Sequence, residues 1–249
     1  MELTSREYWI DYYKASSEDK ETLIRICGKY DSFWDLLHKS CASKPKSILE
    51  IGAFPGRYLA YVASRYQLDA TGIDFNPTIE KFERNMKIMG VDRYEYICTD
   101  FLNHTPVEKY DLVISNGFIE HFDNFNHVLD LHAKYLCNGG SMLIMIPNKR
   151  FLRFIYGNLL DRKNQLAHNL KCMKLSVFRD FAVRNNLTIK YLSYQGGFAY
   201  KVHDQLNPFQ KIIYHPVRYL SIKLNRFLSS NPSKWWSGTI ISIFNKPLK

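Results

Sequence analysis

The chain has 249 residues, 46% of them hydrophobic, and a formal net charge of +10. This length fits one large α/β domain, or one such domain with an elaborated end. No apolar leader segment is present, and the apolar runs stay far below the roughly 20 residues that cross a membrane, so we expect a cytoplasmic protein. The five cysteines form no CxxC pair, which indicates neither a zinc site nor a disulfide framework.

The positive charge is concentrated in the C-terminal part of the chain. Residues 149–249 contain 18 Lys and Arg against 3 Asp and Glu, a net charge of +15, whereas residues 1–148 carry −5. Such a basic segment indicates an anionic partner: a phosphorylated substrate, an acidic membrane surface or a nucleic acid. The alternative is a basic surface without a specific partner.

The first 43 residues have apolar and aromatic side chains at helical spacing, and strands and helices then alternate. The pattern predicts strands at 47–51, 70–73, 94–98, 112–115 and 141–146, and helices at 57–66, 77–89 and 126–136, the last ended by Gly139 and Gly140. Further along, it predicts a helix at 176–185, a strand at 187–193, a basic helix at 208–228 interrupted at Pro216, and a strand at 239–244. Apolar strands that alternate with helices are typical of a parallel sheet covered on both faces.

The end of the first predicted strand carries a glycine loop, Glu50-Ile51-Gly52-Ala53-Phe54-Pro55-Gly56. The two glycines let the backbone turn sharply beneath a ligand, and the following helix offers free N–H groups at its start. A dinucleotide fold would have a glycine at the position of Phe54, close to the pyrophosphate. The missing glycine, together with the acid Glu50 below the loop, favours a cofactor that has an ammonium group and no pyrophosphate.

Acidic residues also follow the second and third predicted strands. Asp74 lies 22 residues after Gly52, where a carboxylate can accept both hydroxyls of an unphosphorylated ribose. The alternative is that Asp74 only caps the next helix. Asp100 could accept the exocyclic amine of adenine, with Phe101 against the ring, and its alternative is a polar loop residue.

Together, these strand ends resemble the class I S-adenosylmethionine-dependent methyltransferases, in particular the small-molecule branch that includes the ubiquinone-pathway enzymes. The matching segments lie in order over roughly residues 45–200: Leu49-Glu50-Ile51-Gly52 with Gly56, Gly72-Ile73-Asp74, Asp100-Phe101, 110–116 with Ile119-Glu120-His121, and Gly139-Gly140 before Ile146-Pro147-Asn148. The resemblance implies an α/β fold: a Rossmann-like seven-stranded sheet, mostly parallel, with an antiparallel last strand and helices on both faces. An N-terminal helical cap at 1–43 would precede a methyltransferase domain at 44–249, with 149–175 and 200–235 as insertions on the acceptor side.

The resemblance also implies S-adenosyl-L-methionine as the cofactor. Glu50 would lie near its methionine ammonium, the backbone of Gly52 and Ala53 would face it, and Asn116 would offer its carbonyl beside the sulfonium. The predicted cofactor-binding residues are Glu50, Gly52, Ala53, Phe54, Gly56, Asp74, Phe75, Asp100, Phe101 and Asn116.

The sequence departs from this family in its loop and in its metal ligands. Phe54 replaces the middle glycine of the usual loop, which is tolerated if its backbone keeps a negative φ. Ubiquinone-pathway relatives that bind a divalent metal use an acid three residues before the Glu-His pair, and Gly117 stands there, so no metal site is predicted. The segment 115–118 also lacks the Pro-Pro-aromatic motif of enzymes that methylate amide or base nitrogen.

Methyl transfer to a hydroxyl usually needs a general base, whereas transfer to an amine can proceed without one. The candidate catalytic residues are His121, which follows the fourth strand, and His168, which lies where the family often builds its acceptor pocket. The alternative for His121 is a structural role at a helix start. We predict methyl transfer to a hydroxyl or amine of a small molecule, a sugar or a lipid-linked acceptor. An RNA methyltransferase and a non-catalytic scaffold are the alternatives, although no RNA-binding module is recognised.

Two segments outside these motifs each have two interpretations. Four N-terminal aromatic residues either close over the cofactor or pack as an ordinary helix; they are Tyr8, Trp9, Tyr12 and Tyr13. In 209–228, apolar residues share one helical face, with the basic residues largely elsewhere. We prefer the interpretation in which this helix covers the sheet and completes the acceptor pocket, and the alternative is peripheral contact with an anionic membrane.

Overall fold

The computed structural model describes the whole chain except residues 1–2, 5, 15–18, 204 and 249, and the side chains of Asp11, Tyr12 and Lys14 also lie outside the described part. The N-terminal helices are α1 (Arg6–Lys14), α2 (Lys20–Cys27) and α3 (Asp31–Lys39), with a 3-10 turn, η1 (Gly28–Tyr30), between the last two. The sheet region contains β1 (Ser47–Ile51), α4 (Arg57–Tyr66), β2 (Asp69–Asp74), α5 (Ile79–Met89), β3 (Tyr94–Cys98), η2 (Phe101–Asn103), β4 (Tyr110–Asn116), η3 (Ile119–His121), α6 (Phe125–Lys134) and β5 (Leu136–Pro147). The remainder contains α7 (Leu152–Leu160), α8 (Arg162–Leu166), α9 (Leu175–Arg184), β6 (Thr188–Gln195), α10 (Pro208–Lys223), α11 (Asn225–Ser230) and β7 (Thr239–Asn245).

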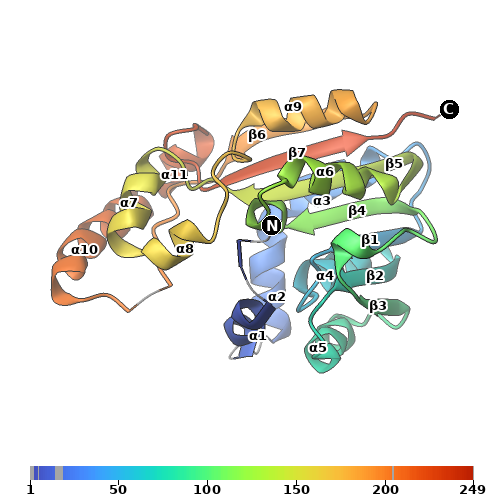
Figure 1. Cartoon of the computed structure of the whole chain (residues 1–249), viewed down its shortest axis with the longest axis horizontal. Helices are drawn as coiled ribbons and strands as arrows, with labels where there is room; N and C mark the ends of the chain where they lie inside the picture. Colours follow the sequence, from blue (N-terminus) through green and yellow to red (C-terminus); the bar gives the residue numbers. More distant parts are fainter. Residues whose placement is uncertain (1–2, 5, 15–18, 204, 249) are drawn as a thin grey trace.

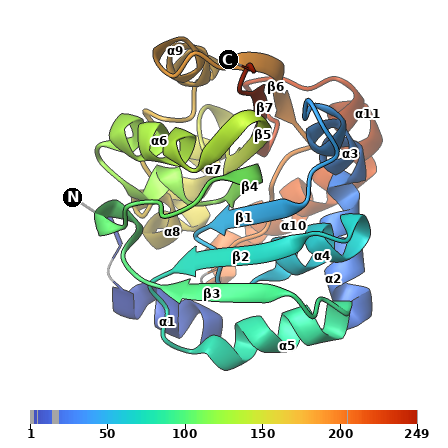
Figure 2. The ribbon, with the colours of Figure 1, turned by 90° about the vertical axis from the view of Figure 1, so that its right-hand side faces the viewer.

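The seven strands form one sheet in the order β3-β2-β1-β4-β5-β7-β6. The pairs from β3 to β5 are parallel, and β7 is antiparallel to both of its neighbours (Figure 2). The predicted mostly parallel sheet with an antiparallel last strand is therefore confirmed. The chain leaves β1 toward β2 on one side and later returns to β4 on the other, which opens a crevice at the carboxyl ends of these strands, where ligands bind in such folds.

Helices cover both faces of the sheet (Figures 1 and 2). On one face, α4 and α5 enclose an apolar cluster with α2 and α3, whose Leu23 and Trp34 are fully buried. On the other face, α6 and α9 enclose a second cluster that contains Phe178 and Phe181. The predicted N-terminal cap therefore consists of two parts, because α2 and α3 belong to the core of the sheet domain and only α1 lies at the strand ends.

Two sequence-based predictions were wrong in detail. The helix predicted at 126–136 ends at Lys134, and the two glycines lie inside β5. They belong to a bulge, since Tyr110 pairs with Leu136 but Leu112 pairs with Ser141, and Gly139 has a φ of +80°. Pro216 does not interrupt its helix either, because α10 runs through it from Pro208 to Lys223.

Beyond the strand ends, α7, α8, α10 and α11 form a separate layer at one end of the molecule, on the left in Figure 1. We call these four helices the lobe. The amide of Gln210 in α10 donates to the Leu159 carbonyl of α7, so that the two insertions meet there. None of the helices in the described part of the chain combines the length and the hydrophobicity that a membrane span needs.

Candidate functional site

Two adjoining cavities open at the carboxyl ends of β1, β2 and β4. The first, which we call the cleft, is bordered by Asp74, Phe75, Asp100 and Phe101. The second, which we call the polar cavity, is bordered by Lys149, Arg153, Asn164, His168, Lys201 and His203. Both are also lined by the same seven residues, Trp9, Tyr13, Gly52, Phe54, Asn116, Gly117 and His121. A molecule in the cleft and a molecule in the polar cavity would therefore meet at these shared residues.

The glycine loop follows β1 closely and is tied to β2. The amides of Gly52 and Ala53 donate to the Ile73 carbonyl at 2.9 and 3.1 Å. Gly52 has a φ of +71°, and a Cβ there would lie 2.5 Å from the Phe118 ring, so that only glycine fits. Phe54 is not among the described residues with positive φ, so it meets the expectation that a phenylalanine is tolerated here only with a negative φ.

Gly56 lines neither cavity among the described lining residues. Its φ is +86° and a Cβ there would lie 2.7 Å from the Phe82 ring. This glycine lets α4 begin close against α5, and its predicted contact with the cofactor has no support in this geometry.

Glu50 holds the loop from below. Its two carboxylate oxygens accept hydrogen bonds from the Leu59 amide at 3.0 Å and from the Asn116 side-chain amide at 2.8 Å. Burial raises the pKa of Glu50 to about 8, although both hydrogen bonds favour the ionised form. Because Asn116 donates to Glu50, its carbonyl oxygen turns the other way, and this buried oxygen has no hydrogen-bond partner among the described residues.

Asp74 and Asp100 both border the cleft, as predicted for ribose and adenine recognition. Asp74 accepts from the amides of Phe54 at 3.1 Å and Asn76 at 2.9 Å, so it also fixes the loop. Burial raises its pKa. Asp100 accepts from the Leu102 amide at 3.0 Å and forms an ion pair with Arg6 of α1 at 3.4 Å.

Helix α1 lies over the junction of the two cavities. The Trp9 ring meets His121 edge-on at 4.6 Å, and the Tyr13 ring meets Phe54 at 5.3 Å. Arg6 lies 5.5 Å from the centre of the Phe75 ring. These contacts join α1 to predicted cofactor-binding residues and to the candidate base His121, whereas ordinary helix packing would join it to the core.

The two candidate bases lie together, with ring centres 4.6 Å apart. His121 donates its Nδ1 proton to the Ala167 carbonyl at 2.8 Å, and His168 donates its own to the Asn164 carbonyl at 2.6 Å. Each ring therefore keeps a lone pair on Nε2. Burial lowers the pKa of His121 to about 4 and that of His168 further, so both rings are neutral at pH 7.

Glu120 completes a cluster with these histidines. One ligand atom from each of Glu120, His121 and His168 lies within 4.8 Å of the others. Two neutral imidazoles and a carboxylate are a donor set that can hold a divalent cation. Gly117 supplies no side-chain metal ligand, but Glu120, His121 and His168 form a different candidate site for a cation. Burial raises the pKa of Glu120 to about 8.

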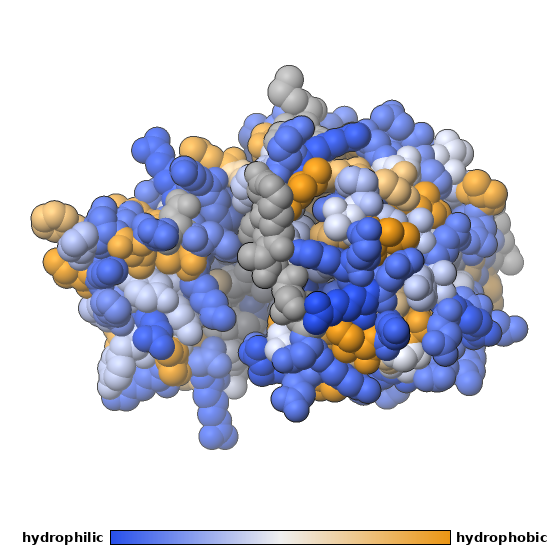
Figure 3. Space-filling model, turned by 90° about the horizontal axis from the view of Figure 1, so that it is seen from below, coloured by the Kyte–Doolittle hydropathy of each residue, from blue (hydrophilic) through white to orange (hydrophobic). Residues whose placement is uncertain are grey.

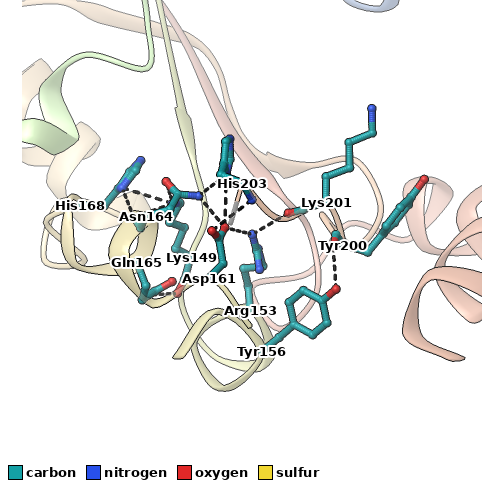
Figure 4. Close-up of polar contacts among 10 residues, drawn as sticks. All are labelled: Lys149, Arg153, Tyr156, Asp161, Asn164, Gln165, His168, Tyr200, Lys201 and His203. Atoms are coloured by element: carbon teal, nitrogen blue, oxygen red, sulfur yellow. Dashed lines mark hydrogen bonds and ion pairs between the residues drawn. The ribbon is translucent and has the colours of Figure 1, made fainter. Parts of the chain in front are cut away.

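A network of charged and polar side chains borders the polar cavity, and Figure 4 shows the contacts within it. Asp161, which is buried, accepts from Asn164 at 2.7 Å and pairs with Arg153 at 3.5 Å. Lys149 donates to both oxygens of Asn164, its backbone carbonyl at 3.0 Å and its side chain at 2.7 Å. Burial and the neighbouring Arg153 lower the pKa of Lys149 to about 7.

Sequence reasoning missed this network. Lys149 directly follows the strand end Ile146-Pro147-Asn148, which was a usable signal, but Arg153 and Asp161 lie in the weakly patterned segment that follows. Arg153 is 5% exposed, and its Nη1 has no hydrogen-bond partner among the described residues. A buried guanidinium with a free donor suits an anionic group in the adjoining cavity.

Comparisons with known proteins agree with this architecture. A family model described as a methyltransferase domain matches residues 26–194, which is more than half of the chain. A ubiquinone biosynthesis O-methyltransferase of Dictyostelium discoideum is 32% identical over 76 residues, 30% of this chain; the match spans only about a quarter of that relative, 24% of its length.

Two solved structures show the same fold over most of the chain. A methyltransferase from Thiobacillus denitrificans, in complex with S-adenosylhomocysteine, has a TM-score of 0.58 at 15% identity and covers 99% of this chain and 100% of its own. Coclaurine N-methyltransferase, bound to N-methylheliamine and S-adenosylhomocysteine, has a TM-score of 0.58 at 13% identity, with 93% and 74% covered. The chain therefore belongs to the methyltransferase domain family and has the fold of the class I S-adenosylmethionine-dependent methyltransferases.

Proposed function

We propose that this protein transfers a methyl group from S-adenosylmethionine, bound in the cleft, to a hydroxyl or amine of a small acceptor in the polar cavity. The observation that carries the proposal is that the two cavities meet at Gly52, Asn116 and His121. Bound there, the cofactor supplies an activated methyl group for in-line displacement. The protein then has to align the acceptor, exclude water and handle one proton.

The side chains of the cleft fit this cofactor. The unpartnered carbonyl oxygen of Asn116 suits an ammonium donor, and Glu50 fixes the orientation of that amide. A cationic group bound beside Asn116 would also favour the ionised form of Glu50. Asp74 and Asp100 would bind the ribose and adenine, with Phe75 and Phe101 beside them. The methionine part would reach the junction of the cavities, where it would face the backbone of Gly52 and of Ala53, which borders only the polar cavity.

His121 and His168 would handle the proton of a hydroxyl acceptor. Both rings are neutral with Nε2 unprotonated, as a general base requires, and both border the polar cavity. Lys149 and Arg153, on the same cavity, would bind an anionic group of the acceptor. The insertions 149–175 and 200–235 would then be the acceptor side, since they contribute His168, Lys201 and His203.

The test is formation of S-adenosylhomocysteine with a panel of phenols, sugars and amines, each with and without a carboxylate or phosphate. We expect turnover with at least one anionic hydroxyl acceptor. His168→Gln should lower that turnover at least tenfold while S-adenosylhomocysteine binds within twofold of wild type. An exposed matched variant, His127→Gln on α6, should leave both unchanged. Cofactor binding without turnover for any acceptor would instead favour a non-catalytic scaffold.

A further inference from the structure

Helix α10 has its apolar face turned away from the protein. The residues that face inward recur at a spacing of three to four, and they are Gln210, Tyr214, Val217 and Ser221, of which only Ser221 is buried. The remaining, outward-facing surface of the helix carries Phe209, Ile212, Ile213, Tyr219 and Leu220, of which Phe209 is 80% and Ile212 69% exposed. A helix that only covered the protein core would show the reverse arrangement. The preferred sequence-based interpretation, in which this helix covers the sheet and completes the acceptor pocket, is therefore wrong, since the described residues lining the two cavities also include none from α10.

Other parts of the lobe also expose large apolar side chains. On α7 they include Leu152, Phe154, Ile155 and Leu159; Leu224 lies between α10 and α11, Phe227 on α11, and Trp235 in the segment after it. Seen from below, orange hydrophobic side chains lie among blue ones at the left end of the molecule, where α10 lies (Figure 3). So many large apolar side chains exposed in one part of the molecule indicate an interaction site.

The charges of the lobe indicate what binds there. The four helices contain no Asp or Glu, and their exposed charged side chains are all basic: Arg162, Lys163, Lys211, Arg218, Lys223 and Arg226. Exposed apolar residues with basic residues around them suit the interface of an anionic lipid bilayer, where the apolar side chains enter the acyl boundary and the cations meet lipid phosphates. A second copy paired about a twofold axis would instead bring the same basic residues together.

We infer that the lobe docks on an anionic membrane surface through the outer face of α10, together with the exposed residues of α7 and α11. Docking requires neither cofactor nor catalysis. It has one consequence that rests on the proposed function: because Arg153 of α7 and Asn164 of α8 line the polar cavity, docking would bring that cavity close to the lipid headgroups. The acceptor would then be amphiphilic, with its reacting group in the headgroup layer.

Cosedimentation with vesicles tests the docking. Wild type should bind vesicles containing 30% phosphatidylglycerol at least tenfold more tightly than pure phosphatidylcholine vesicles, and salt should weaken the binding. The triple variant Phe209→Gln, Ile212→Gln, Leu220→Gln should lose at least tenfold in binding to the anionic vesicles. The matched control is Val107→Gln, Val183→Gln, Leu248→Gln, because these three exposed apolar residues lie outside the lobe. It should bind within twofold of wild type.

Circular dichroism and S-adenosylhomocysteine binding establish that each variant is folded. The inference is overturned if wild type does not bind anionic vesicles, or if the lobe variant binds as well as the control. It is also overturned if wild type forms a dimer that the lobe variant abolishes while neither protein binds vesicles, because the face would then belong to a second copy. Vesicle binding does not depend on methyl transfer. A failure of the proposed function can therefore be distinguished from a failure of membrane docking.

Discussion

The sheet domain and the lobe use amphipathic helices in opposite ways. In α9, the large apolar residues Phe178 and Phe181 face the sheet and are fully buried. In α10, the large apolar residues face outward and the buried residue is Ser221. The first arrangement provides folding free energy by removing apolar surface from water, and the second leaves that surface for another partner. Hydrophobic periodicity alone does not distinguish the two, because it gives the spacing of a face and not the direction in which the face points.

The largest expected effect is on the free energy of unfolding, when a phenylalanine is truncated to alanine in the sheet domain and, for comparison, in the lobe. Phe178→Ala should lower the free energy of unfolding by about 3–5 kcal/mol, because it removes a fully buried ring and leaves a cavity. Phe209→Ala should change it by less than about 0.5 kcal/mol, because that ring is mostly exposed. Urea denaturation measures both. A cost for Phe209→Ala close to that of Phe178→Ala would mean that the lobe face is covered in solution.

The next largest effect is a pH dependence of stability that comes from a buried histidine. His132 of α6 is fully buried, and burial lowers its pKa from 6.5 to about 4. The unfolded state therefore binds a proton at a higher pH than the folded state, so its contribution to stability is present above pH 6.5 and is lost as the pH falls toward 4.

The comparison of wild type with His132→Phe isolates this histidine from the other titrating groups. Relative to the variant, wild type should lose up to about 3 kcal/mol between pH 6.5 and pH 4, since each pKa unit corresponds to about 1.4 kcal/mol. Urea denaturation across this range provides the measurement. If the difference in unfolding free energy between the two proteins stays constant with pH, the pKa of His132 is not lowered in the folded state.

A smaller effect concerns the position of α1 over the cleft. Trp9→Ala removes the ring that contacts His121 and lines both cavities, so it should weaken S-adenosylhomocysteine binding about fivefold, or roughly 1 kcal/mol. Ile24→Ala on α2 is the matched control, because Ile24 is exposed away from the cavities, and it should bind like wild type. If wild type, Trp9→Ala and Ile24→Ala bind S-adenosylhomocysteine with equal affinity, α1 does not contribute to cofactor binding and only packs against the protein.

Much of the sheet domain could be predicted from the sequence because its strands are short and mostly apolar, and because glycine or acidic residues follow several of them. The predicted bounds of β1, α4 and β3 match the structure, and the residues at the strand ends meet at one crevice. The two cavities themselves could not be predicted, since Lys149, Arg153 and Asp161 are brought together by tertiary packing between α7, α8 and the end of β5. The continuation of α10 through Pro216 was also missed, because an interior proline removes one backbone donor and can kink a helix without ending it.

The most direct test of the central claim is calorimetric binding of S-adenosylhomocysteine to wild type, to Asp74→Ala and to the lobe variant Phe209→Gln, Ile212→Gln, Leu220→Gln, with NAD as a control ligand. We expect micromolar-range binding to wild type, at least about tenfold weaker binding to Asp74→Ala, roughly 1.4 kcal/mol, and unchanged binding to the lobe variant. NAD should not bind. Binding that is insensitive to Asp74→Ala, or a preference for NAD, would contradict the assignment of the cleft as the cofactor site.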